Sequence, residues 1–311
     1  MYSSQSHQYA SAKEQWIAPF DYQERHAGMK VRTTLTHALA ELYQIEAAHT
    51  QVICHCVERF NTASLVHDDI VDQDQLRRGA PSVWVKFGVA TALISGMYGY
   101  IEGLQKLGEL HCVELLQIGL QSLEALHIGQ HLDTQISEGT TLPTMDEYRF
   151  VAQINTGCFF LFILEACQRL KPVSDSCYLE LKGMLLELAI YYRLVNDYCD
   201  INHTPHFKKK GFAPDLEGGP KSFLMILAGQ PLEKKQRSEL QKRKIINEWG
   251  KSGVFSQALT TMENSYTHVQ QYFSRAQRHL DDESFISLRE FLQNIHFQQN
   301  PQDNFYEWQL R

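Results

Sequence analysis

Three carboxylates that could hold a metal ion stand in the run DDIVD at residues 68–72. Asp68 and Asp72 are four residues apart, so on a helix they lie one turn apart on the same face. Carboxylates this close repel one another unless a cation lies between them. Mg²⁺ typically uses one or two carboxylates together with substrate phosphates. We therefore expect Asp68, Asp69 and Asp72 to be catalytic, with Asp68 and Asp72 as metal ligands.

The alternative for this run is a solvated acidic helix end. The segment NTASLV at residues 61–66, directly before it, is mostly small or apolar, which favours a half-buried helix. A second run, NDYCD at residues 196–200, also follows an apolar stretch. Asn196 and Asp200 share a helix face there. We expect Asn196, Asp197 and Asp200 to be metal ligands, and the two aspartates to be catalytic.

Basic side chains accompany both acidic runs. Arg77 and Arg78 follow the first run, and guanidinium groups bind phosphate oxygens in bidentate fashion. A long segment at residues 203–220, with lysines at 208–210, follows the second and is expected to be a mobile basic loop. Two carboxylate faces, an arginine pair and a lysine-rich loop together predict a site for a diphosphate bound with Mg²⁺.

The elements that must position these groups are helices. Apolar residues recur every three or four positions through several long stretches, whereas alternating strand patterns are scarce. The expected helices are roughly 34–58, 61–72, 83–107, 113–138, 145–170 and 176–201, with more towards the C-terminus. No linker or internal repeat is visible, so we expect one all-α domain over residues 1–311.

The composition limits the class of function. The chain has 29 Lys plus Arg against 36 Asp plus Glu, a net charge of −7, which argues against nucleic-acid binding. The most apolar stretch, residues 157–164, ends at Glu165, whereas a spanning helix needs about 20 residues, so no transmembrane segment is expected. The first residues lack the pattern of a secretory signal, and the seven cysteines are scattered. We therefore expect reduced thiols and a cytoplasmic location.

In these motifs the sequence resembles the trans-isoprenyl diphosphate synthases, or polyprenyl synthetases. The runs at 68–72 and 196–200 resemble the family's two aspartate-rich motifs, although Asn196 replaces an aspartate. LRRG at 76–79 and GQHLD at 129–133 match at the expected spacing, and Lys210 precedes Asp215 by five residues as in the family's loop. The resemblance covers about residues 27–228, and residues 1–20 are expected to be a poorly ordered or accessory segment.

The resemblance implies a helical bundle around a central cavity, with the two acidic motifs facing each other and three Mg²⁺ ions bound with the substrate diphosphate. It also implies a homodimer. The implied activity is a Mg²⁺-dependent prenyltransferase that ionises an allylic prenyl diphosphate and couples the prenyl group to an acceptor, by default isopentenyl diphosphate. The residues expected to bind diphosphate are Arg77, Arg78, Lys30, Arg32, Lys210, Gln130 and Asn155.

The sequence departs from the family mostly at the acceptor side. Met29 and Asn61 stand where the family has a lysine and a histidine or glutamine, and Asn155 replaces a lysine that normally contacts the allylic diphosphate. A further lysine is displaced, as Lys221. Each lost charge-assisted contact is worth about 1.5–3 kcal/mol. Either Lys30 or Arg32 compensates, or the second substrate is not isopentenyl diphosphate or is absent.

Two other functions stay open. A class I terpene cyclase would act on the allylic diphosphate alone, but Asp200 and Thr204 stand where its second metal motif has Ser or Thr and Glu. A non-catalytic partner subunit is the other, and the intact acids at 68–72 argue against it.

The length of the product depends on the residues below the first motif. Ala63 and Ser64 are too small to close the cavity, whereas Phe60, one turn further, could form its floor. This predicts products of about C15 to C20. Phe159 and Tyr98 are alternatives on other helices.

Overall fold

The computed structural model describes residues 7–26 and 28–309. It is almost entirely helical, so the all-α prediction is confirmed. The helices are α1 (His7–Arg25), α2 (Val31–Leu42), α3 (Ala47–Asp72), α4 (Val83–Phe87), α5 (Val89–Gly108), α6 (Val113–Glu138), α7 (Met145–Asn155), α8 (Gly157–Leu170), α9 (Asp175–Asn202), α10 (Thr204–Lys210), α11 (Phe223–Ala228), α12 (Glu239–Lys251), α13 (Val254–Ala276), α14 (Ile286–Ile295) and α15 (Phe305–Gln309). Two short strands, β1 (Leu76–Arg77) and β2 (Ala80–Pro81), form a hairpin after α3, and short 3₁₀ helices span Pro214–Leu216, Gln277–His279 and Asp282–Phe285.

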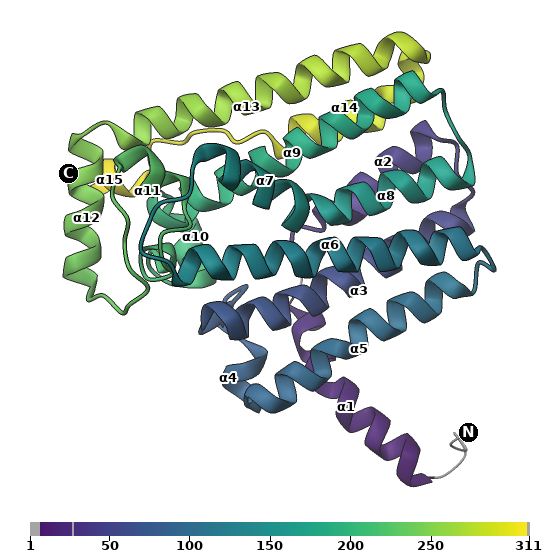
Figure 1. The fold of residues 1–311 in the computed structure, drawn as a ribbon, viewed down its shortest axis with the longest axis horizontal. Coiled ribbons are helices and arrows are strands. Elements are labelled where there is room, and N and C mark those ends of the chain that lie inside the picture. Colours follow the sequence, from purple (N-terminus) through teal and green to yellow (C-terminus); the bar gives the residue numbers. More distant parts are fainter. Residues whose placement is uncertain (1–6, 27, 310–311) are drawn as a thin grey trace.

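The long helices α3, α5, α6, α9 and α13 run across the molecule roughly along one direction, and α12 crosses them at one end (Figure 1). Helix α9 packs against α13, α8 and α7, while α3 packs against α5 and α2. Much of α9 is buried, including Leu181, Leu185, Leu188 and Leu194. The two helices that carry the acidic runs, α3 and α9, are therefore fixed by extensive apolar packing.

The C-terminal region, which carries no readable motif, anchors the end of α9. The amide of Phe297 donates to the Tyr191 hydroxyl at 2.6 Å, and the amide of Tyr306 donates to Asn202 Oδ1 at 2.8 Å. The amide of Thr204 donates to the carbonyl of Asp303 at 2.9 Å. The segment at 297–306 thus holds the part of α9 that contains the second acidic run.

Several expected elements differ from the structure. The stretch 34–58 is not one helix, because Gln44 adopts a left-handed conformation with φ +53° between α2 and α3. The stretch 145–170 divides at Thr156 into α7 and α8, which meet at a bend of 49°. The expected mobile loop at 203–220 contains α10 and a 3₁₀ turn, and its Phe212 carbonyl accepts a hydrogen bond from Lys242.

The N-terminal segment, expected to be poorly ordered or accessory over residues 1–20, contains a helix. Residues 1–6 lie outside the described residues, but His7–Arg25 forms α1, which packs on α5. Its Phe20 is fully buried and contacts Tyr98 edge to face. Residues 7–20 are therefore part of the packed helical structure.

No single helix among the described residues is long and apolar enough to cross a bilayer. The bent pair α7 and α8 meets the length and composition criteria only when its two members are taken together.

Helix α5 approaches α3 closely because three of its residues on that side are glycines. A Cβ atom at Gly103 would lie 2.6 Å from the Phe60 ring, and one at Gly99 would lie 2.6 Å from both the Arg59 carbonyl oxygen and the Phe20 ring. Gly96 similarly faces His67. The close contact between the two helices depends on the missing side chains.

We expect Gly99→Ala to lower the free energy of unfolding by about 1–3 kcal/mol, because the new methyl group meets a backbone oxygen that cannot move aside. Alanine is otherwise the better helix former by about 1 kcal/mol. Gly108→Ala on the same helix is the control, since nothing lies within 4 Å of a Cβ there. Urea denaturation measures both variants, and a Gly99→Ala protein as stable as the control would contradict this account.

Candidate active site

A cavity of about 570 Å³ opens between α2, α3, α6 and α9, and both acidic runs contribute to its wall. Most residues expected at the site line this cavity. They are Lys30, Arg32, Ser64, Asp68, Asp72, Arg77, Arg78, Gln130, Asn155, Asn196, Asp197 and Lys210. Four expected residues lie behind the wall: Phe60, Ala63, Asp69 and Asp200.

The first acidic run occupies the last turn of α3, where the negative end of the helix dipole disfavours carboxylates. The helix ends at Gln73, whose φ of +61° turns the chain into the β1–β2 hairpin. Burial, together with the charge of Asp72, raises the pKa of Asp68 to about 6. The end of α3 therefore needs cations, and the structure supplies them from two sides.

Arg77 is the first of these cations, and it is committed to carboxylates inside the protein. Its Nε donates to Asp69 Oδ1 at 2.7 Å, and its Nη2 contacts Asp69, Asp74 at 3.1 Å and Asp68 at 3.4 Å. Arg77 is 7% exposed and Asp69 is fully buried. Asp69 thus positions Arg77 instead of facing the cavity.

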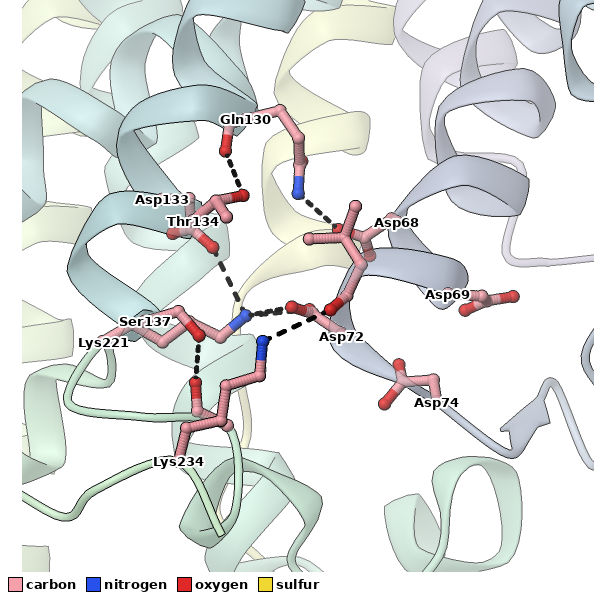
Figure 2. Close-up of polar contacts among 12 residues, drawn as sticks. Asp68, Asp69, Asp72, Asp74, Gln130, Asp133, Thr134, Ser137, Lys221 and Lys234 are labelled. Atoms are coloured by element: carbon pink, nitrogen blue, oxygen red, sulfur yellow. Dashed lines mark hydrogen bonds and ion pairs between the residues drawn. The ribbon is translucent and has the colours of Figure 1, made fainter. Parts of the chain in front are cut away.

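Lys221 is the second cation, and it comes from the loop before α11 (Figure 2). Its Nζ lies 2.8 Å from both carboxylate oxygens of Asp72 and 3.3 Å from Asp133 Oδ2. Asp133 also pairs with Arg193 from α9. Burial alone would raise the pKa of Asp133, but Arg193 and Lys221 outweigh it and hold the pKa at about 2.

Two amides on α6 and α7 orient Asp68. Gln130 Nε2 donates to Asp68 Oδ1 at 3.3 Å, and Asn155 Nδ2 donates to Gln130 Oε1 at 3.4 Å. The helices approach closely here, since a Cβ on Gly129 would lie 2.8 Å from Asn155. Asn155 therefore acts on Asp68 through Gln130 as well as facing the cavity.

The second acidic run lies near the C-terminal end of α9. Asp197 Oδ2 accepts hydrogen bonds from the Tyr148 hydroxyl and from the Phe223 amide, both at 3.1 Å. Burial raises the pKa of Asp197 to about 6, although the nearby Arg193 opposes this shift. Asn196 lines the cavity beside Asp197 and adds an uncharged oxygen donor.

Asp200 belongs to a buried cluster behind this wall. It is fully buried, with His206 Nε2 at 2.8 Å from Oδ1 and Lys210 Nζ at 3.9 Å from Oδ2. Burial and the adjacent Asp200 raise the pKa of Asp215 well above its usual range. Asp200 therefore holds α10 and Lys210 in place, an arrangement that differs from the metal contact expected for it.

The cations on the side of the cavity near Met29 already have partners within the protein. Lys30 Nζ lies 3.1 Å from Glu58, which also accepts a hydrogen bond from Thr33. The Arg32 guanidinium lies 5.4 Å from the centre of the Phe159 ring. Arg78 Nη1 donates to the His26 carbonyl at 2.7 Å. Met29 lines the cavity here and is 72% exposed.

Phe159 of α8 and Phe60 of α3 lie at different depths from the cavity. Phe159 lines the cavity, whereas Phe60 is fully buried behind it, with the two ring centres 6.5 Å apart. Phe60 also contacts Phe162. Ala63 faces the core, and Ser64 faces the cavity. Of the residues expected to limit product length, Phe159 therefore lines the cavity and Phe60 does not.

Several residues of the site were not expected as such. Asp133 ends the GQHLD motif, and Lys221 is the displaced lysine, so both carried a signal in the sequence. Arg193 precedes Asp197 by one helical turn, which places it on the same face of α9. Tyr148 carried no signal in the sequence, because its role depends on how α7 packs against α9.

The charges in the cavity contrast with those of the whole chain. Among the described residues, eight lysines and arginines line the cavity against six aspartates and glutamates, although the chain has a net charge of −7. The acids are Glu58, Asp68, Asp72, Asp133, Asp197 and Asp215, and the bases are Lys30, Arg32, Arg77, Arg78, Arg193, Lys209, Lys210 and Lys221. Such a cavity attracts an anion and still offers carboxylates to a metal.

The available donors fit a hard divalent cation that binds together with a phosphate. Asp68 and Asp72 on one wall, and Asn196 and Asp197 on another, present oxygen atoms. In the described part of the chain, no three His, Cys, Asp or Glu side chains converge to hold a metal by themselves. Mg²⁺ commonly takes only one or two carboxylates and completes its shell with water and phosphate oxygens.

Known proteins with similar sequences include enzymes named as prenyl diphosphate synthases. The model of the polyprenyl synthetase family matches residues 13–262. A geranylgeranyl pyrophosphate synthase of Neocamarosporium betae is 33% identical over 220 residues, which cover 70% of this chain and 63% of that protein. Another from Aspergillus flavus is 32% identical over 208 residues, covering 67% and 60%. The chain thus spans less than two thirds of the length of these relatives.

Solved structures share the fold at low identity. The polyprenyl synthase of Caulobacter crescentus, solved with calcium and isoprenyl diphosphate, matches with a TM-score of 0.77 at 20% identity, covering 93% of this chain and 89% of that one. The geranylgeranyl pyrophosphate synthetase of the archaeon Geoglobus acetivorans matches with a TM-score of 0.73 at 21% identity, covering 91% and 90%. With its helical fold, its two acidic runs at one cavity and a family match over most of its length, the chain belongs to the polyprenyl synthetase family.

Proposed function

We propose that the protein is a Mg²⁺-dependent prenyltransferase that ionises an allylic prenyl diphosphate and transfers the prenyl group to an acceptor, by default isopentenyl diphosphate. The observation that carries this proposal is the cavity itself, which brings Asp68, Asp72, Asn196 and Asp197 to one space surrounded by cations. The relatives named geranylgeranyl pyrophosphate synthase support the same substrate class.

The polar side chains of the cavity would bind the metal ions and the diphosphate. Asp68, Asp72, Asn196 and Asp197 would hold up to three Mg²⁺ ions, which neutralise the charge that develops on the departing diphosphate. Lys210, at the end of α10, and Lys221, from the loop before α11, reach the same region and would bind phosphate oxygens. Gln130 keeps the Asp68 carboxylate in place while the carbon–oxygen bond breaks.

The rest of the cavity protects and receives the allylic cation. Phe159 and Leu126 line it, and apolar walls exclude water that would otherwise capture the cation. Lys30, Arg32 and Arg78 stand at the side where the acceptor would bind. Joining the cation to the acceptor's double bond and losing a proton to the departed diphosphate completes the transfer.

The first test supplies purified protein with Mg²⁺ and labelled farnesyl diphosphate, with and without isopentenyl diphosphate. We expect a longer prenyl diphosphate only when both substrates are present, measured by chromatography after phosphatase treatment. Hydrocarbon or alcohol formed from farnesyl diphosphate alone would indicate a terpene cyclase. Consumption that requires a different acceptor would retain prenyl transfer and replace isopentenyl diphosphate, and no turnover with any pairing would contradict an enzyme.

In the same assay, replacing Asp68 and Asp72 together by Asn should lower turnover by about 1000-fold, because the leaving group loses its metal ligands. Helical content measured by circular dichroism should stay unchanged. Asp74→Asn is the matched control, since Asp74 also pairs with Arg77 but does not line the cavity. Full turnover in the double variant would remove the metal assignment.

Product length tests the floor of the cavity. We expect Phe159→Ala to give longer products and Phe60→Ala alone to leave the length nearly unchanged, because Phe159 separates Phe60 from the cavity. The double variant should give the longest chains. Phe273→Ala is the control for lost core volume, since Phe273 packs on Phe285 away from the site. Longer products from Phe60→Ala alone would restore Phe60 as the floor.

We further propose that the protein forms a homodimer through α5 and α6. Adjacent turns of α5 expose apolar side chains, and α6, which packs beside α5, exposes others. These residues are Val89, Leu93, Ile94, Met97 and Ile101 on α5, with Leu120 and Ile128 on α6. An exposed apolar patch of this kind usually marks a surface that binds another protein. A cytoplasmic location stays a prediction of the sequence.

Sedimentation velocity tests the dimer. The unmodified protein should sediment as a dimer at micromolar concentration. The variant with both Leu93→Glu and Met97→Glu should sediment as a monomer, because the buried glutamates of the two protomers would repel each other across the interface. Leu240→Glu is the control, since Leu240 is 78% exposed on the distant α12. A monomeric unmodified protein would contradict the proposal.

A further inference from the structure

Lys221 lies between two carboxylates, and one of them, Asp72, is an expected metal ligand. Its ammonium lies 2.8 Å from both oxygens of Asp72 and 3.3 Å from Asp133, and Figure 2 shows these contacts. It is deeply placed, with its side chain 11% exposed. We propose that Lys221 is a resident counter-ion of the first acidic run, which releases Asp72 to the metal only when a diphosphate arrives to receive the ammonium.

The loop that carries Lys221 is built to deliver it to this point. Ser137 at the end of α6 donates a hydrogen bond from its hydroxyl to the Gly218 carbonyl. Gly219 has φ +88°, and a Cβ there would lie 1.9 Å from the Ser137 carbonyl oxygen. Only glycine permits both this backbone conformation and this approach. The loop is therefore held against α6, and Lys221 follows two residues later.

The charges around Lys221 explain why a metal ion alone should bind weakly. Asp72 and Asp133 carry two negative charges, and Lys221 and Arg193, which pair with them, carry two positive charges, which leaves no net charge. Without Lys221 the same group would have a net charge of −1. A divalent cation is attracted more strongly to the second arrangement, particularly in this partly desolvated place.

The geometry makes the ammonium and a metal ion direct competitors for Asp72. Mg²⁺ binds carboxylate oxygens at about 2.0–2.1 Å, and the ammonium of Lys221 already contacts both of those oxygens. Two cations on the same side of one carboxylate repel each other. The flexible stem of a lysine lets its ammonium move onto phosphate oxygens that enter the cavity. Metal and diphosphate would then bind with positive coupling.

This inference rests on the proposed function, and a binding experiment separates the two. Mn²⁺ in place of Mg²⁺ is titrated into the protein and followed by electron paramagnetic resonance, with and without inorganic pyrophosphate. In the unmodified protein, pyrophosphate should tighten Mn²⁺ binding strongly. In Lys221→Met, Mn²⁺ alone should bind about tenfold or more tightly than in the unmodified protein, and the effect of pyrophosphate should shrink.

Lys234→Met is the matched control. Lys234 approaches the same helix end, but its Nζ donates to the Val71 carbonyl at 3.4 Å and to no carboxylate there (Figure 2). Its removal should leave the affinity for Mn²⁺ alone nearly unchanged. Gly219→Ala is a second variant, which displaces the loop without removing a charge, and it should shift Mn²⁺ binding in the same direction as Lys221→Met. Thermal unfolding verifies that each variant is folded.

Unchanged affinity for Mn²⁺ alone in Lys221→Met, with normal binding of Mn²⁺ and pyrophosphate together, would overturn the inference and leave the proposed function intact. An equal gain in Lys234→Met would also overturn it, because the effect would then reflect general charge. Absence of Mn²⁺ binding in every variant and condition would overturn the metal–diphosphate function itself, and the inference with it.

Discussion

Two carboxylates lie together on the last turn of a helix, and much of the structure around them neutralises their negative charge. The C-terminal end of α3 carries the negative end of the helix dipole, and Asp68 and Asp72 add charge to it. The protein places the cation of Arg77 on one side of this helix end and that of Lys221 on the other. The hairpin after α3, the loop before α11 and the end of α6 are arranged around these two cations. Several irregular segments of the chain therefore help to neutralise the negative charge at the end of α3.

Cations and hydrogen-bond donors also stabilise the carboxylates on the opposite wall of the cavity. Arg193 lies between the acids of α6 and α9, and Asp197 is held by a tyrosine hydroxyl and a backbone amide. Asp200 turns inward and orders the lysine-rich segment through His206 and Lys210. Each acidic run thus divides into residues that face the cavity and a residue that supports the wall from behind.

Sequence reasoning reached the parts of this design that depend on short-range spacing. Asp68 and Asp72 share a face because they are four residues apart, and the apolar periodicity located the helical stretches, of which 113–138 and 176–201 correspond closely to α6 and α9. The same spacing could have shown that Asp69, one residue on, points elsewhere. The partners of Lys221 and Tyr148 depend on loop docking and helix packing between distant segments, which no local pattern records. The position of Phe159 at the cavity, with Phe60 behind it, has the same cause, since it depends on how α8 packs against α3.

The anchoring of α9 by the segment at 297–306 has a consequence for folding during translation. Translation produces α3 first, α9 more than a hundred residues later, and the anchoring segment later still. Phe297 and Tyr306 contact Tyr191 and Asn202, so the far wall gains this support only after residues 297–306 have left the ribosome. A nascent chain thus carries the acids of α3 well before it can assemble the cavity in which the proposed allylic cation would be protected.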